Sequence, residues 1–157
     1  MNWFVNNREV IRNLAVNTGT SQNPTFTKMC TTSEITLNVD NEVKDFYVFC
    51  DAIKRSLITG TSLKLSATVK IDISNTAIQT MLGNVHTLIE DGTVAQLNNV
   101  LVQFELLEDA TGGVLTYVKY QVPVIMNITE LGGAAEDEGE FAVELTFNGT
   151  GTVVASS

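Results

Sequence analysis

The feature that most constrains this chain is a run of twelve residues, 62–73, in which polar and apolar side chains alternate without interruption. The apolar members of the run are Leu63, Leu65, Ala67, Val69, Ile71 and Ile73. A period of two places successive side chains on opposite faces of a β-strand, with one face buried and the other in water. The same alternation returns at Tyr120, Val122, Val124, Met126 and Ile128, and at Phe141, Val143, Leu145 and Phe147. The sequence therefore predicts long strands with one apolar face.

Shorter patterns add further strands and the turns between them. Alternating or β-branched residues predict strands at 25–30, 31–40, 45–50, 100–108, 114–130 and 140–149. We expect a turn or kink at 39–42, a projecting loop at 51–60, a hairpin turn at 109–113 and a longer acidic loop at 132–139. Pro123 cannot donate a ladder hydrogen bond, so its strand should be near an edge or bulged at that point.

One helix is well marked between the long strand and the later ones. Ser74 or Asn75 can cap its first turn, and Gly92 stands where a left-handed residue ends a helix. Its apolar residues recur at helical spacing: Ile78, Leu82, Val85 and Ile89, with Met81 and Leu88 beside them. We therefore expect an amphipathic helix at about 75–91 that packs on one side only.

These elements predict a mainly β fold, an antiparallel β-sandwich or barrel of six or seven strands with one amphipathic helix. The first 24 residues are read as an N-terminal arm, in which residues 10–16 form either a short strand or an irregular segment. Residues 25–157 are read as one domain, a size that allows a single core.

Charge and composition exclude several function classes. The net charge of −9 disfavours tight binding to nucleic acid or to an anionic membrane, because both need a basic surface. The start of the chain lacks the pattern of a secretory signal, and no apolar run is long enough to span a bilayer, so we expect no membrane insertion. Cys30 and Cys50 are expected to be reduced thiols that act as small core residues, with a disulfide as the alternative.

The sequence contains little that indicates catalysis. His86 is the only histidine, it lies in the middle of the predicted helix, and we expect it on the surface. No cluster has the spacing of a metal site, and the acidic residues near 136–140 are read as a solvated loop. The glycine pairs are turn residues, with no phosphate-binding motif. We expect no enzymatic activity and no cofactor.

The order of the elements resembles the major tail tube protein of tailed bacteriophages. The similarity lies in Ile58-Thr-Gly-Thr-Ser-Leu-Lys-Leu-Ser66, which leads into the long strand, in the lone amphipathic helix, and in a terminal strand that ends on Asn-Gly-Thr-Gly151. It covers roughly residues 25–154. The same fold is similar to the tube proteins of contractile injection systems and type VI secretion.

The resemblance implies a structural virion protein, assembled in the host cytoplasm and located in the tail. Its copies would form hexameric rings stacked into a hollow tube, through which genomic DNA passes without specific binding. It implies tape measure, tail terminator and distal tail proteins as further partners. Ring closure would pair strand edges that are an aggregation hazard in a monomer, and an acidic wall would repel the DNA phosphates.

Two sets of residues are candidates for roles in such a tube. Residues on polar strand faces are candidates to line the channel: Ser66, Thr68, Gln121, Thr146 and Asn148. Residues in the segment 41–54 and in the acidic loop are candidates to contact an adjacent ring: Asn41, Glu42, Lys44, Asp51, Lys54, Glu136, Asp137 and Glu138. Lys64 and Lys70 oppose the acidic charge of the polar face.

A monomeric β-sandwich that binds carbohydrate or protein is the alternative. Such a module needs an exposed aromatic platform, for which Trp3, Tyr47, Tyr117 and Tyr120 are the candidates. An enzyme is the third possibility.

Overall fold

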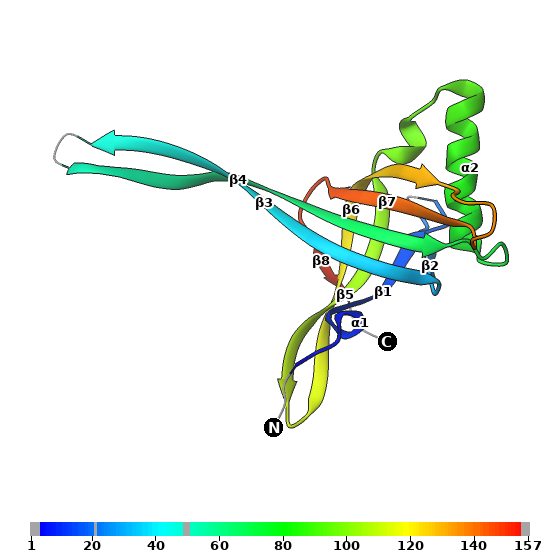
Figure 1. The fold of residues 1–157 in the computed structure, drawn as a ribbon, viewed down its shortest axis with the longest axis horizontal. Coiled ribbons are helices and arrows are strands. Elements are labelled where there is room, and N and C mark those ends of the chain that lie inside the picture. The colour runs from blue at the N-terminus through cyan, green and yellow to red at the C-terminus, as the bar shows by residue number, and fades with distance from the viewer. Residues whose placement is uncertain (1–3, 21, 49–50, 155–157) are drawn as a thin grey trace.

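The computed structural model describes residues 4–20, 22–48 and 51–154 (Figure 1). These residues form one antiparallel sheet of eight strands in the order β2-β1-β5-β6-β7-β4-β3, with β8 paired to β6. The strands are β1 (Ile11–Asn17), β2 (Phe26–Lys28), β3 (Thr32–Val48), β4 (Asp51–Lys70), β5 (Val100–Thr111), β6 (Val114–Leu131), β7 (Glu140–Phe147) and β8 (Thr152–Val154). The helices are α1 (Asn7–Val10), α2 (Thr76–Asp91) and the short 3₁₀ helix η1 (Ala95–Leu97). The mainly β antiparallel fold is confirmed, with eight strands in place of six or seven, and the described strands form one sheet that does not close into a barrel.

The core lies on one face of the curled sheet, as the alternation predicts. β4 buries Leu65, Ala67 and Val69, β7 buries Phe141, Val143 and Leu145, and β6 buries Val122, Val124 and Met126. The prediction is wrong at one end of the long run, because β4 ends at Lys70 and Ile73 is exposed.

Helix α2 has the predicted caps. The Asn75 side chain accepts a hydrogen bond from the backbone N–H of Ala77 at 2.8 Å, and Gly92 ends the helix with a φ of 67°. The apolar face of α2 is buried only in the first half of the helix, at Ile78 and Met81, whereas Ile89 is 74% exposed. Figure 1 shows the reason, because the C-terminal end of α2 extends past the sheet. The expectation that the apolar face of the helix is buried along its whole length is therefore wrong at Ile89.

The longest feature is a hairpin of β3 and β4 that leaves the body of the molecule (Figure 1, cyan to green, left). The two strands pair from Thr32↔Val69 to Val48↔Asp51. The predicted loop at 51–60 is therefore wrong, since these residues belong to β4, although they do project. The turn alternative for 39–42 is also wrong; the irregularity is a register shift between Glu42 and Val43 inside a continuous strand.

The N-terminal residues enter the sheet. β1 lies between β2 and β5, so the short strand is the correct alternative for residues 11–16. The pairing with β5 shifts between Arg12 and Ala15, and Asn13 has a φ of 56°. The division of the chain at residue 24 into an N-terminal segment and one domain stays a prediction.

The remaining connections follow the predicted turns. β5 and β6 are joined by Gly112 and Gly113, whose φ values of 63° and 81° fit a two-residue hairpin turn that favours glycine. The expectation of an edge strand or a bulge at Pro123 is wrong, because β6 is an internal strand and its register with β5 is regular there. β7 ends at this position, and β6 pairs with β7 only from Val124 onward. The backbone N–H that Pro123 lacks is therefore not needed for the pairing of β6 with β7.

Candidate assembly surfaces

The outer part of the β3–β4 hairpin is a two-stranded ribbon, which we call the arm and define as residues 39–48 and 51–63. β4 pairs with β7 only from Lys64 to Lys70, and β3 pairs only with β4. No third strand therefore supports the arm within the described part of the chain. Isolated two-stranded hairpins are marginally stable in water.

An apolar stripe runs along one face of the arm. Val39 is paired with Leu63, and Val43 with Ile58, on the face that carries the core pair Leu37 and Leu65 farther in. Val39, Val43 and Ile58 are 57–58% exposed. The apolar face of the core thus continues into solvent, and we call these four residues (39, 43, 58 and 63) the apolar stripe.

The polar side chains of the arm bond across its two strands. Lys54 Nζ lies 3.1 Å from Asp45 Oδ2, and the Ser56 hydroxyl donates to Asp45 Oδ1 at 2.6 Å. The hydrogen bond from Ser56, followed by the contact with Lys54, lowers the pKa of Asp45. Thr61 donates to the Asn41 side chain at 2.7 Å.

The other predicted contact residues of this segment also lie on the arm. Glu42 and Lys44 are exposed, and Asp51 is the first residue of β4, with its side chain outside the described set.

The candidates for a channel face fall into two groups. Ser66, Thr68 and Thr146 lie on one face of β4 and β7, where Lys64 pairs with Thr146 and Ser66 with Glu144. Lys64 Nζ lies 3.5 Å from Glu144 Oε1, so this lysine has an acidic neighbour on the polar face.

Gln121 and Asn148 form hydrogen bonds with residues outside that group. Gln121 accepts a hydrogen bond from the buried Gln103 at 3.1 Å. Asn148 follows β7 and donates to Asn99 at 3.1 Å.

The acidic loop at 132–139 is exposed and tied to β4. Lys70 Nζ lies 3.1 Å from Glu138 Oε2, and this hydrogen bond, with the negative charge of Glu138, raises the pKa of Lys70. The Ile71 N–H donates to the Gly139 carbonyl at 2.8 Å. Glu136 and Asp137 are exposed. Across the described ranges, no group of three or more histidine, cysteine and acidic residues is placed to hold a metal ion.

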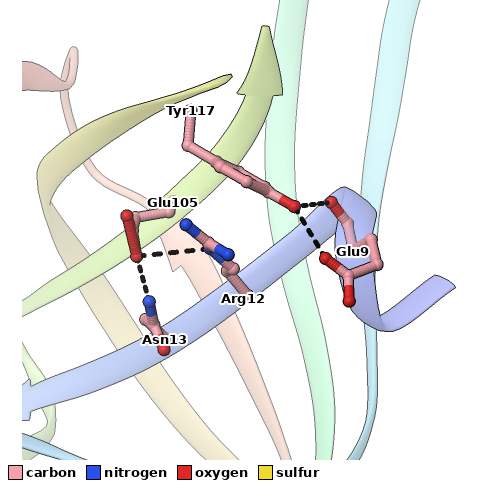
Figure 2. Close-up of polar contacts among 5 residues, drawn as sticks. All are labelled: Glu9, Arg12, Asn13, Glu105 and Tyr117. Atoms are coloured by element: carbon pink, nitrogen blue, oxygen red, sulfur yellow. Dashed lines mark hydrogen bonds and ion pairs between the residues drawn. The ribbon is translucent and has the colours of Figure 1, made fainter. Parts of the chain in front are cut away.

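A polar cluster that the sequence analysis missed joins α1 and β1 to β5 and β6 (Figure 2). The Tyr117 hydroxyl donates to the Glu9 carbonyl at 2.7 Å and lies 3.0 Å from its carboxylate. The Arg12 guanidinium lies 3.5 Å from the centroid of the Tyr117 ring, and its Nε lies 3.7 Å from Glu105, which also accepts from Asn13. Burial, followed by the hydrogen bond to Glu9, raises the pKa of Tyr117. The partners in this cluster are separated by 92 to 108 positions in the chain, so no local spacing in the sequence indicates it.

The aromatic candidates do not form a platform among the described residues. Tyr117 is covered by Arg12, and the ring centroid of Tyr120 lies 5.8 Å from that of Phe104. Tyr47 is exposed on the arm, and Trp3 lies outside the described residues.

An open groove of about 640 Å³ lies between the root of β3 and the α1–β1 segment, and we call it the seam groove. Apolar residues that line it are Val10, Ile11, Leu14, Ile35, Leu37 and Leu106. Cys30 also lines it and is an exposed thiol, so the expectation of a core position is wrong for this residue. The neighbouring Met29 is buried in its place, and Cys50 lies outside the described residues.

Two further expectations concern the surface and the membrane. His86 is exposed on α2, as predicted. None of the helices in the described ranges has the length and apolar character needed to cross a bilayer.

Comparison with solved structures shows where this fold occurs. A chain from the tail of an empty gene transfer agent particle, determined with helical refinement and C6 symmetry, superimposes with a TM-score of 0.62. The two chains are 12% identical, and the match covers 97% of this chain and 100% of that one. A chain from the virion of a native gene transfer agent particle gives a TM-score of 0.55 at 14% identity, over 91% of this chain and 96% of that one. No protein-family model and no curated protein sequence matches the chain. The comparison therefore shows that this chain shares its fold with a chain of a gene transfer agent tail.

Proposed function

We propose that this protein is a structural subunit of a phage-like tail, which assembles into stacked rings around a hollow tube that conducts DNA. The observation that carries this proposal is the likeness in fold to a chain of a C6-symmetric helical tail over almost the full length of both chains. The protein would act in the virion tail as a building block, without catalysis and without a cofactor.

The surface of the subunit supports assembly for a physical reason. The arm exposes both an apolar stripe and unpaired strand edges, which are the features that promote association between chains. In a closed ring and a stacked tube these groups would be buried between copies, and the aggregation hazard would become the assembly contact. We infer that the arm reaches an adjacent ring, and that Asn41, Glu42, Lys44, Asp51 and Lys54 belong to that contact.

The charge of the subunit suits a conduit for DNA. A chain of net charge −9 repeated around a ring gives a negative electrostatic field. This field repels the phosphates of the DNA, so that the DNA does not bind to the wall of the tube. The polar face with Ser66, Thr68 and Thr146 is our candidate for the channel wall, and Glu144 offsets the charge of Lys64 there. Gln121 and Asn148 would lie along the same wall.

Further contacts of the proposed tube follow from its place in a tail. The acidic loop with Glu136, Asp137 and Glu138 is a second candidate for contact between rings. Six subunits per ring, and tape measure, tail terminator and distal tail proteins as partners, complete the proposal.

Sedimentation velocity on the purified protein tests the proposal. We expect a large species whose fraction rises with protein concentration. A sample that sediments only as a 17.0 kDa monomer at every concentration and salt level would contradict it.

A further inference from the structure

The seam groove is a cavity that the packing of the single chain leaves unfilled. Its lining is mixed: apolar side chains, among them the core residues Ile11 and Leu14, lie beside basic ones, Arg8, Arg12 and Lys28. Its volume of about 640 Å³ is in the range of sites that bind a ligand or a peptide segment.

The groove is also bordered by strand edges without a partner in the described residues. β3 pairs only with β4, so its other edge faces the groove from Thr32 onward. β2 pairs with β1 only at Ala15–Asn17, which leaves the section of β1 at Ile11–Asn13 without a strand on that side. An extended segment laid in the groove would therefore gain backbone hydrogen bonds as well as apolar contacts.

We propose that the seam groove receives the arm of a second copy of this chain. This inference rests on the proposed function, because it names the surface that accepts the arm within the assembly. The arm presents the apolar stripe on an extended backbone, as the groove requires. The outer edge of each of its two strands has no partner strand among the described residues.

The chain cannot fill its own groove in this way. The groove lies at the Thr32–Leu37 end of β3, and the arm begins at Val39 and continues away from the body (Figure 1). β3 and β4 stay paired through this region, so the arm could reach its own groove only by a sharp bend of both strands. We therefore assign the groove to the arm of another copy.

The geometry of this contact also determines the kind of assembly. The ten residues of β3 in the arm, 39–48, at about 3.3 Å per residue, extend about 30 Å from the body. Insertion of the arm of one copy into the groove of the next is a head-to-tail contact between two different surfaces. Contacts of this type generate rings or helical filaments, not closed dimers.

Cysteine cross-linking tests the proposal, because the native Cys30 lines the groove. Cys50 is replaced by serine, Val43→Cys is introduced in the stripe, and the assembled protein is treated with a short bismaleimide. We expect a ladder of covalent oligomers on a denaturing gel, and loss of this ladder when Cys30 is also changed to serine. Lys44→Cys provides a second probe on the arm if the change at Val43 weakens assembly.

The matched control is Glu90→Cys, an exposed position on α2 outside the arm and the acidic loop. Electron microscopy of each sample separates this proposal from the function it rests on. Tubes that form without a ladder from either arm probe, or with an equal ladder from the α2 control, would overturn the groove contact and leave the tube function intact. A protein that forms no tubes at all would overturn both.

Discussion

The hydroxyl of Tyr117 on β6 donates a hydrogen bond to the backbone carbonyl of Glu9 in α1, at 2.7 Å. This contact joins the start of the chain to a strand more than a hundred residues later, and the Arg12 guanidinium over the tyrosine ring strengthens it. α1 has only one turn, so it depends on such contacts for its position.

Tyr117→Phe should therefore loosen α1 with little change elsewhere. Removal of one hydroxyl that makes a typical hydrogen bond lowers the free energy of unfolding by about 0.5–1.5 kcal/mol. Urea denaturation measures this loss, and hydrogen exchange should locate it at residues 7–12. Tyr47→Phe, at an exposed position on the arm, is the control and should leave both readings unchanged.

The same contact predicts a dependence on alkaline pH. The pKa of Tyr117 is raised by burial and by Glu9, so the folded protein holds this proton more strongly than the unfolded chain does. The stabilisation is complete below the ordinary tyrosine pKa and is lost as the pH rises through the higher folded value. An ultraviolet titration of the wild type should show a tyrosine ionisation above the ordinary tyrosine pKa, and Tyr117→Phe should remove that late step.

Phe141→Asp should prevent folding. Phe141 is 2% exposed on the core face of β7, and a carboxylate there has no partner and replaces a large buried ring. The expected loss is more than about 4 kcal/mol, which is enough to unfold a marginally stable domain. Thr146→Asp, on the opposite face of the same strand, should remain folded, as circular dichroism would show. A folded Phe141→Asp variant would contradict the assignment of this face of β7 to the core.

Ile58→Asp should separate assembly from folding. Ile58 is 57% exposed on the arm, so a charge there leaves the fold of the single chain intact. In an assembly the same charge would be buried against a neighbour and would weaken association. We expect an unchanged thermal midpoint and a loss of large species in sedimentation. Ser62→Asp, also exposed on the arm, should have the smaller effect on assembly.

The ion pair between Lys70 and Glu138 should restrain the acidic loop. Both side chains are exposed, so the pair is weakened by salt and its effect is local. Glu138→Gln should speed exchange of the Ile71 amide proton, which bonds to the loop at Gly139. Glu136→Gln is the control, and equal acceleration by the two variants would show that the ion pair does not hold the loop.

The sequence predicts the elements that lie against the core. The alternation in β4, β6 and β7 and the caps of α2 are local signals, and the core confirms them because each apolar residue has a surface to cover. The order of these elements also predicts the fold, which the chain shares with a chain of a gene transfer agent tail.

The arm and the N-terminal strand were harder to predict for separate reasons. Residues 51–60 were read as a loop because a strand that leaves the sheet has no core to face and loses its alternation. In β1 the bulge at Asn13 interrupts the period of two, so that Leu14, Ala15 and Val16 are all buried in succession. The Tyr117–Glu9 contact depends on distant residues that only the folded chain brings together.

Negative-stain electron microscopy of the purified protein tests the central claim most directly. The account predicts long hollow cylinders with a regular axial repeat, which Ile58→Asp should abolish. Fields that contain only single small particles, at high protein concentration and in every buffer, would contradict it.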